Sequence, residues 1–196
     1  MKDLFVLARQ VQDFLDAHEW RSCVIGGIAV QRWGEPRLTR DVDVTLLTGL
    51  GGEEKYVDEI LRRYSSRVPG GREFALKQRV MLLKSDDGTG IDLALGGLPF
   101  EANVIDRAGE FEFYPGMSLR TCSAEDLIVM KAFAGRELDW GDVKGIIARQ
   151  GARLDWSTVL TELRPLCELK EAPEIVERLE KLRPRQRRNS RKGAVE

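Results

Sequence analysis

The sequence has one histidine, three cysteines and no long apolar run, and each scarcity excludes a class of protein. With His18 as the only histidine in 196 residues, histidine-based triads and multi-histidine metal sites are excluded. Cys23, Cys122 and Cys167 are too few and too widely spaced for a disulfide framework or a zinc pattern, so we expect reduced, partly buried thiols. No apolar stretch approaches the roughly 20 residues of a membrane span. The N-terminus carries no basic segment followed by an apolar one, so it does not predict a secretory signal. We therefore expect a cytoplasmic protein with no membrane partner, whose catalysis rests on carboxylates, lysine or arginine.

The charges are nearly balanced over the whole chain but unevenly distributed along it. There are 31 Lys and Arg against 32 Asp and Glu, a net charge of -1. The C-terminal end is basic, with Glu196 as its one acid against Lys181, Arg183, Arg185, Arg187, Arg188, Arg191 and Lys192. A basic end on an acidic body is typical of contact with nucleic acid or an acidic partner, and equally of a solvated, disordered terminus.

The spacing of apolar residues changes character near residue 121. Before it, the pattern predicts helices over 3–18, 28–33, 53–64 and 99–107, and strands over 22–25, 41–47, 74–76, 79–84, 89–95, 111–114 and 117–121. A turn is expected over 68–71. Beyond it, all periodic segments are helical, over 127–134, 143–148, 156–166 and 175–182. We therefore predict an α+β fold, a small mixed β-sheet core with flanking helices over 1–121, followed by a C-terminal helical lobe over 122–182 that packs on the core. A basic, disordered tail is expected over 183–196.

Carboxylates mark two of the predicted strands. Residues two apart on a strand point to the same face, so Asp41 and Asp43 present two oxygen ligands side by side. Asp92 is a single acid in an otherwise apolar strand. Carboxylates held together repel one another unless a cation lies between them, and oxygen-only ligands suit Mg²⁺. Such a pattern predicts a metal site, although an Asp-x-Asp also occurs on solvated strand faces and in glycosyltransferases and nucleases.

A glycine pair and two arginines precede the aspartates. Gly26 and Gly27 follow a predicted strand and open a predicted helix, where backbone amides can approach a phosphate closely. Arg37 and Arg40 can hold the remaining phosphate charge. Metal, amides and arginines together indicate phosphoryl or nucleotidyl transfer, in which positioning and charge neutralisation supply most of the rate.

The order of these motifs resembles a known family. It reads Gly26-Gly27, Arg37-Leu38-Thr39-Arg40-Asp41-Val42-Asp43, Asp92, Leu127-Ile128-Val129-Met130-Lys131 and Arg136-Glu137-Leu138-Asp139-Trp140-Gly141-Asp142. From about residue 24 to 147 this resembles the polymerase-beta-like nucleotidyltransferase superfamily. More closely, it looks like the AbiEii/AbiGii-type nucleotidyltransferases, many of which are toxins of toxin–antitoxin pairs. Many superfamily members carry Gly-Ser where this chain has Gly-Gly, so a serine hydroxyl is missing.

The resemblance implies a role for each of these residues. Asp41, Asp43 and Asp92 would hold Mg²⁺, with Mn²⁺ as the alternative ion, and Asp92 would also be the base toward an acceptor hydroxyl. Lys131 would be catalytic and would reach the nucleotide phosphates. Nucleotide binding would further use Gly26, Gly27, Arg37, Thr39, Arg40, Arg136, Asp139 and Asp142, with Asp139 or Asp142 fixing Lys131 or Arg136.

The leading hypothesis is therefore a Mg²⁺-dependent nucleotidyltransferase that moves an NMP from an NTP to an acceptor hydroxyl and releases pyrophosphate. The acceptor is left open among an RNA such as tRNA, a protein side chain and a small molecule, and a cognate antitoxin is an expected partner if the chain is a toxin. The first alternative is a non-catalytic protein of the same fold that binds nucleotide or a partner. The second is another Asp-x-Asp enzyme, a glycosyltransferase or nuclease. The sequence leaves the preferred nucleotide and the oligomeric state undetermined.

Overall fold

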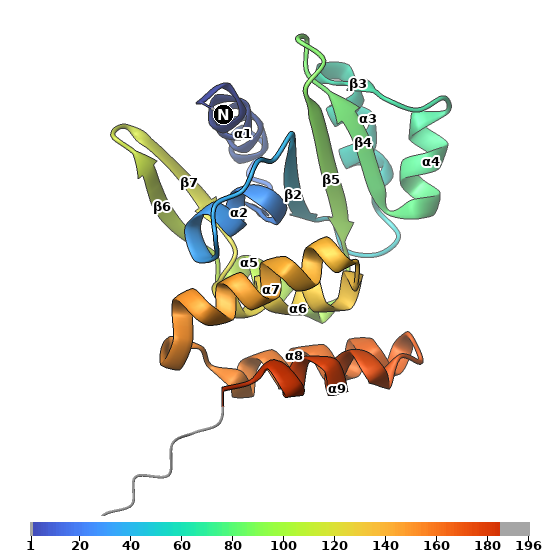
Figure 1. Cartoon of the computed structure of the whole chain (residues 1–196). Coiled ribbons are helices and arrows are strands. Elements are labelled where there is room, and N and C mark those ends of the chain that lie inside the picture. Colours follow the sequence, from blue (N-terminus) through green and yellow to red (C-terminus); the bar gives the residue numbers. More distant parts are fainter. Residues whose placement is uncertain (1, 185–196) are drawn as a thin grey trace, which may run out of the picture.

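A seven-stranded mixed β-sheet forms the centre of the protein, in a computed structural model that describes residues 2–184 (Figure 1). The strands are β1 (Ser22–Val24), β2 (Asp41–Leu47), β3 (Ser65–Ser66), β4 (Val80–Lys84), β5 (Gly90–Gly96), β6 (Gly109–Tyr114) and β7 (Met117–Thr121). Their order across the sheet is β3-β4-β5-β2-β1-β7-β6. β2 and β5 run parallel, while β1–β2, β3–β4, β4–β5 and β6–β7 are antiparallel. β2 and β5 therefore lie side by side in the middle of the sheet.

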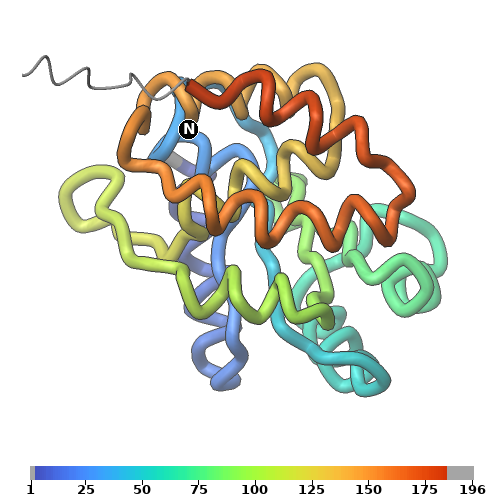
Figure 2. Tube along the Cα trace, turned by 90° about the horizontal axis from the view of Figure 1, so that it is seen from below, coloured from blue at the N-terminus to red at the C-terminus, as the bar shows by residue number. Residues whose placement is uncertain are grey.

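Helices cover both faces of the sheet. They are α1 (Lys2–Ala17), α2 (Gly26–Trp33), α3 (Glu54–Arg63), α4 (Gly71–Gln78), α5 (Pro99–Asp106), α6 (Ala124–Ala134), α7 (Glu137–Gln150), α8 (Trp156–Leu169) and α9 (Pro173–Leu182), with a 3₁₀ turn over Gly151–Arg153. One core joins α1, α3 and α4 to Val42, Val44 and Leu93 on one sheet face. The other joins α2 and α5 to the C-terminal helices. α8 and α9 lie side by side as the outer layer on that side (Figure 2).

The alternating pattern of β2 and β5 follows from these two cores. Val42, Val44, Ile91 and Leu93 are at most 1% exposed and face α1 and α3. Their neighbours along the strands point to the opposite face, because the side-chain period of a strand is two. The central strands thus turn Asp41, Asp43 and Asp92 toward the C-terminal helices.

The structure confirms the predicted α+β class, a mixed sheet followed by helices, and most of the predicted elements. One element is wrong: the segment 74–76, predicted as a strand, lies in helix α4. That segment is rich in good helix formers, and Arg72 of α4 binds Asp58 of α3 at 2.6 Å, which attaches the helix to its neighbour. The short strand β3 was not predicted. All three cysteines are free and buried.

Two further expectations are limited by what the structure describes. Among residues 2–184, no helix is both long enough and apolar enough to cross a bilayer. The predicted basic tail over 183–196 falls almost entirely outside the described residues, which end at residue 184.

Candidate nucleotidyl-transfer site

Three carboxylates gather at the centre of the sheet. Asp43 of β2 is the direct partner of Asp92 on the parallel strand β5, and Asp41 is the partner of Gly90. Neighbouring strands are about 4.8 Å apart, so the two facing carboxylates repel one another. Burial, with the charges of Asp92 and Asp41 added to it, raises the pKa of Asp43. Burial likewise raises the pKa of Asp92, against the lowering effect of Arg67. The sheet therefore concentrates negative charge that favours a bound cation.

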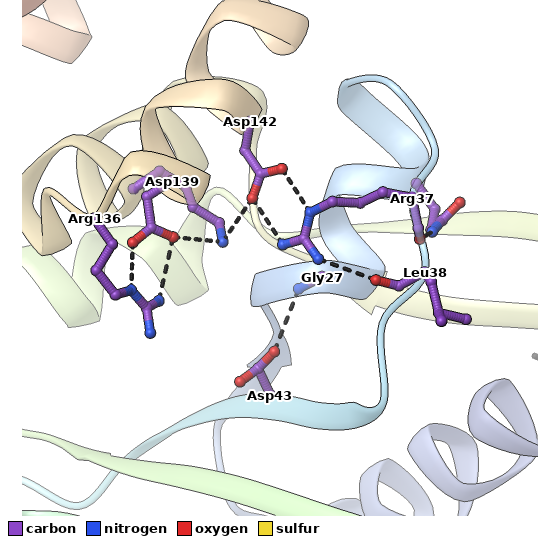
Figure 3. A network of polar contacts seen from close by, with 9 residues as sticks. Gly27, Arg37, Leu38, Asp43, Arg136, Asp139 and Asp142 are labelled. Carbon is purple, nitrogen blue, oxygen red and sulfur yellow. Dashed lines mark hydrogen bonds and ion pairs between the residues drawn. The ribbon is translucent and has the colours of Figure 1, made fainter.

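The glycine pair brings the start of α2 against these carboxylates. The Gly27 amide donates a hydrogen bond to Asp43 Oδ2 at 3.3 Å (Figure 3). A Cβ on Gly26 would lie 2.0 Å from Asp43 Oδ2, and one on Gly27 would lie 2.2 Å from Thr39 Oγ1. Glycine is thus required by space at both positions, and at Gly26 also by its φ of +58°. The N-terminus of α2 and its amides face the position that the carboxylates define.

We expect Gly26→Ala to destabilise the fold and to displace Asp43. The matched control is Gly49→Ala, because Gly49 has a φ of +73° but nothing within 4 Å of the added Cβ. Left-handed strain costs the control about 1 kcal/mol, whereas the clash with Asp43 adds about 1–3 kcal/mol at Gly26. Urea unfolding of both variants measures the difference. Equal losses would show that the Asp43 carboxylate moves away without resistance.

A network of charged side chains forms the opposite wall, and Lys131, Asp139 and Asp142 are its buried members. Lys131 Nζ lies 3.0 Å from Asp139 Oδ1 and 2.9 Å from Asp142 Oδ2. Arg37 holds Asp142 through two hydrogen bonds of 2.7 and 2.8 Å, and Arg136 holds Asp139 at 2.6 and 3.2 Å (Figure 3). Three cations against two carboxylates leave this wall with one positive charge in excess, which suits a polyphosphate.

The turn between α6 and α7 makes this network possible. Gly135 ends α6 with a φ of +74°, in the left-handed region, and α7 begins at Glu137. α6 carries Lys131, and the turn directs the first two turns of α7 back toward it.

The network predicts acid sensitivity. Although burial opposes it, hydrogen bonds from Arg136 and Lys131 lower the pKa of Asp139, and those from Arg37 and Lys131 lower the pKa of Asp142. A carboxyl whose pKa is lower in the folded state contributes stability above its unfolded pKa of about 3.9, and this is lost as pH falls through the folded value. The unfolding free energy of wild type should exceed that of Asp142→Asn, and the difference should be largest above about pH 5. Urea unfolding from pH 7 to pH 3 should show this difference shrinking, and a constant difference would contradict it.

Arg67 is a site residue that the sequence reasoning missed. Its guanidinium forms an ion pair with Asp92, and it lies 3.9 Å from Asp41 Oδ1. Its amide donates to the carbonyl of Leu82 at 2.7 Å, which ties it to the edge of β4. No motif marks this residue, because it arrives through the β3–β4 pairing. Arg67 neutralises part of the charge that the three aspartates concentrate.

The carboxylate oxygens of this cluster match the ligand preference of Mg²⁺. Asp41, Asp43 and Asp92 supply hard oxygen ligands on one face, as this ion requires, with room left for waters and phosphate oxygens. Among the described residues, however, no three acidic, histidine or cysteine side chains already converge on one point. Arg67 engages Asp92 instead. The three aspartates fit Mg²⁺ by their chemistry. In this structure Arg67 supplies the positive charge beside Asp92.

A cavity of about 600 Å³ joins these parts. Every residue predicted for the site lines it except Asp142, which lies behind Arg37 and Lys131. The predicted residues that line it are Gly26, Gly27, Arg37, Thr39, Arg40, Asp41, Asp43, Asp92, Lys131, Arg136 and Asp139. Four segments far apart in the sequence thus meet around one polar cavity.

No protein-family model matches the chain, and no curated protein matches its sequence. Among solved structures, an antigenic nucleotidyltransferase-like protein from Paracoccidioides brasiliensis is similar, with 17% identity, a TM-score of 0.48 and 91% of each chain covered. The lincosamide antibiotic adenylyltransferase LnuA, bound to lincomycin, has 17% identity and a TM-score of 0.48 over 70% of this chain and 92% of its own. ANT(2")-Ia in complex with adenylyl-2"-tobramycin has 20% identity and a TM-score of 0.43 over 91% of this chain and 94% of its own. Similarities of this size concern the general fold, and the function of this chain rests on its own residues.

Proposed function

We propose that this chain is a nucleotidyltransferase that transfers an NMP from an NTP to a hydroxyl group. The observation that carries the proposal is the position of the three aspartates opposite both the Gly26-Gly27 amides and the Lys131 network, around one cavity. Anionic ligands bind at helix N-termini and beside lysine and arginine. A carboxylate cluster facing a cationic wall is the arrangement that a metal-bound polyphosphate requires.

Each group has a distinct task in this proposal. The N-terminus of α2 at Gly26 and Gly27, together with Arg37, Arg40, Lys131 and Arg136, holds the phosphates and orients the α-phosphorus, while the Gly27 amide itself donates to Asp43. Asp41, Asp43 and Asp92 would hold Mg²⁺, or Mn²⁺ in its place, and the ion when bound would neutralise charge on the phosphate oxygens. The acceptor oxygen bonds to the α-phosphorus, the bond to the bridging oxygen of the β-phosphate breaks, and pyrophosphate leaves. Asp92 takes the hydroxyl proton.

A more specific version of this proposal gives the chain RNA as its acceptor and the role of an AbiEii-type toxin. Support for RNA comes from the basic composition of 181–196, most of which lies outside the described residues. A cognate antitoxin would be the partner in that case.

A second candidate is a nucleotide-binding protein that transfers nothing. The ion pair of Arg67 with Asp92 favours it, because a carboxylate engaged by arginine is less available as a ligand or base. In that case Mg²⁺ together with an NTP would raise the melting temperature, as any ligand of the native state does, without turnover.

The test is incubation with Mg²⁺ and each α-³²P-labelled NTP in turn, in the presence of total RNA and an RNA-free small-molecule extract. Asp43→Asn serves as the inactive control. Label on RNA, protein or a small molecule that the control lacks supports transfer and identifies the acceptor class. A melting temperature raised by Mg²⁺ and NTP with no label supports the binding protein instead. Absence of both effects rejects both proposals.

A further inference from the structure

A second cavity, of about 540 Å³, adjoins the carboxylate cavity. Its lining is mainly apolar and comes from the central strands and the C-terminal helices, including Thr45, Ala94, Met130, Phe133, Leu166 and Leu169. Ile25 and Met130 line both cavities, so the two cavities share a wall. Its volume lies within the range of small-molecule sites, about 300–1,000 Å³.

The register of the strands places this cavity next to the reacting groups. Thr45 follows Asp43 by two residues on β2, and Ala94 follows Asp92 by two residues on β5. Residues two apart share a face and are about 7 Å apart along the strand. A ligand whose body lies over Ala94 therefore reaches Asp92 with a short substituent.

The charged side chains of the cavity are engaged by the protein itself. Lys170 Nζ donates to the Phe133 carbonyl at 2.7 Å and lies 4.6 Å above the Phe133 ring. Glu101 Oε2 accepts hydrogen bonds from the amides of Gly97 at 2.8 Å and Leu98 at 2.6 Å. A nucleobase needs partners for its polar edge, whereas this lining offers mostly hydrocarbon. The lining therefore fits an apolar body better than a base.

The rim is apolar and open to solvent. Leu169 is 78% exposed and Leu98 is 41% exposed, and both line the cavity. The cations that suit phosphates lie in the other cavity, at Arg37, Lys131 and Arg136. The two cavities thus differ in chemistry: one is polar and lined by charged side chains of both signs, and the other is apolar and lies beside Asp92.

We infer that the apolar cavity binds the body of a small, largely apolar acceptor that carries a hydroxyl group, and presents that hydroxyl to Asp92. This inference rests on the proposed function. The acceptor oxygen forms the bond to the α-phosphorus as pyrophosphate leaves, and its proton passes to Asp92. The product is a nucleotidylated small molecule, and RNA or protein as the acceptor is the alternative outcome of the transfer test.

Two substitutions alter the apolar cavity and leave the carboxylates and the cationic wall unchanged. One fills the cavity and the other makes its rim charged. Ala94→Met places a long side chain over the strand floor of the cavity. Leu169→Asp places a charge on the rim, at a position so exposed that the fold is not expected to suffer. Leu50→Asp is the matched control, because Leu50 is 69% exposed and does not line either cavity.

The binding test uses the apolar fluorophore 8-anilinonaphthalene-1-sulfonate as the probe. We expect saturable fluorescence enhancement with wild type and with Leu50→Asp, and affinity at least about tenfold lower in Ala94→Met and Leu169→Asp. Far-ultraviolet circular dichroism checks that all four proteins are folded. Unchanged probe affinity in Ala94→Met overturns the inference.

The transfer test follows label from Mg²⁺ and α-³²P-labelled NTP into an RNA-free small-molecule extract and into total RNA. We expect label on a small molecule, reduced at least about tenfold in Ala94→Met and Leu169→Asp. The rise in melting temperature caused by Mg²⁺ and NTP should be the same in all variants. If that rise is present but label appears only on RNA or protein, the acceptor inference fails and the proposed function stands. If wild type shows neither the rise nor any label, the proposed function itself fails.

Discussion

Asp43→Asn is expected to abolish transfer and, in the absence of metal, to make the protein more stable. Burial together with the charges of Asp92 and Asp41 raises the pKa of Asp43, so the ionised carboxylate is disfavoured where it lies. Asparagine removes that charge and still offers an oxygen to the Gly27 amide, which donates to Asp43 Oδ2 at 3.3 Å. Relief of repulsion should raise the unfolding free energy by about 0.5–2 kcal/mol at pH 7. Loss of a metal ligand removes several kcal/mol of transition-state stabilisation, which is about 10³-fold in rate.

The measurements are urea unfolding in a chelator and label transfer with Mg²⁺. Asp41→Asn is the matched control, because the Asp41 side chain is 45% exposed and its charge is better solvated. Its gain in stability should be smaller, while its loss of transfer should be similar. A less stable Asp43→Asn protein, or one that retains turnover, would contradict the assignment of Asp43. Stability and activity therefore oppose each other at this residue.

The sequence is informative wherever a local pattern determines the geometry. The alternation around Asp41 and Asp43 predicts which side chains share a face, and the structure confirms the strand. Its pairing with the strand of Asp92 is parallel and in direct register. The bend at Gly135 is equally local, since a glycine between two helical patterns is a common helix end. These features bring most of the predicted residues to one cavity.

The features that the sequence does not predict depend on contacts between distant segments. Arg67 reaches Asp92 only because β3 pairs with β4 at the edge of the sheet. The segment 74–76 has a short apolar pattern that suits either a strand or a helix. It forms part of helix α4, which packs beside α3. The apolar cavity is built from β2, β5, α5, α6 and α8, and no spacing along the chain indicates their convergence.

Lys131→Met should be the most destabilising single substitution in the site. The Lys131 side chain is 9% exposed and lies between Asp139 and Asp142, whose side chains are 1% and 4% exposed. Methionine keeps much of the volume but leaves the two buried carboxylates with less compensation. Removing one partner of a buried ion pair costs about 3–5 kcal/mol. Arg136→Gln is the comparison, because the Arg136 side chain is 76% exposed and exposed pairs are worth about 0–1 kcal/mol.

A double variant distinguishes uncompensated charge from poor packing as the cause. Adding Asp139→Asn to Lys131→Met removes one of the stranded carboxylates while keeping its shape. If charge is the cause, the double variant should recover much of the lost unfolding free energy, since residues in one ion-pair network do not contribute additively. If the methionine simply packs badly, the second substitution should add to the loss. Binding of Mg²⁺ and NTP, measured as a rise in melting temperature, should stay weak in both variants, because the lysine that faces the phosphates is gone in each.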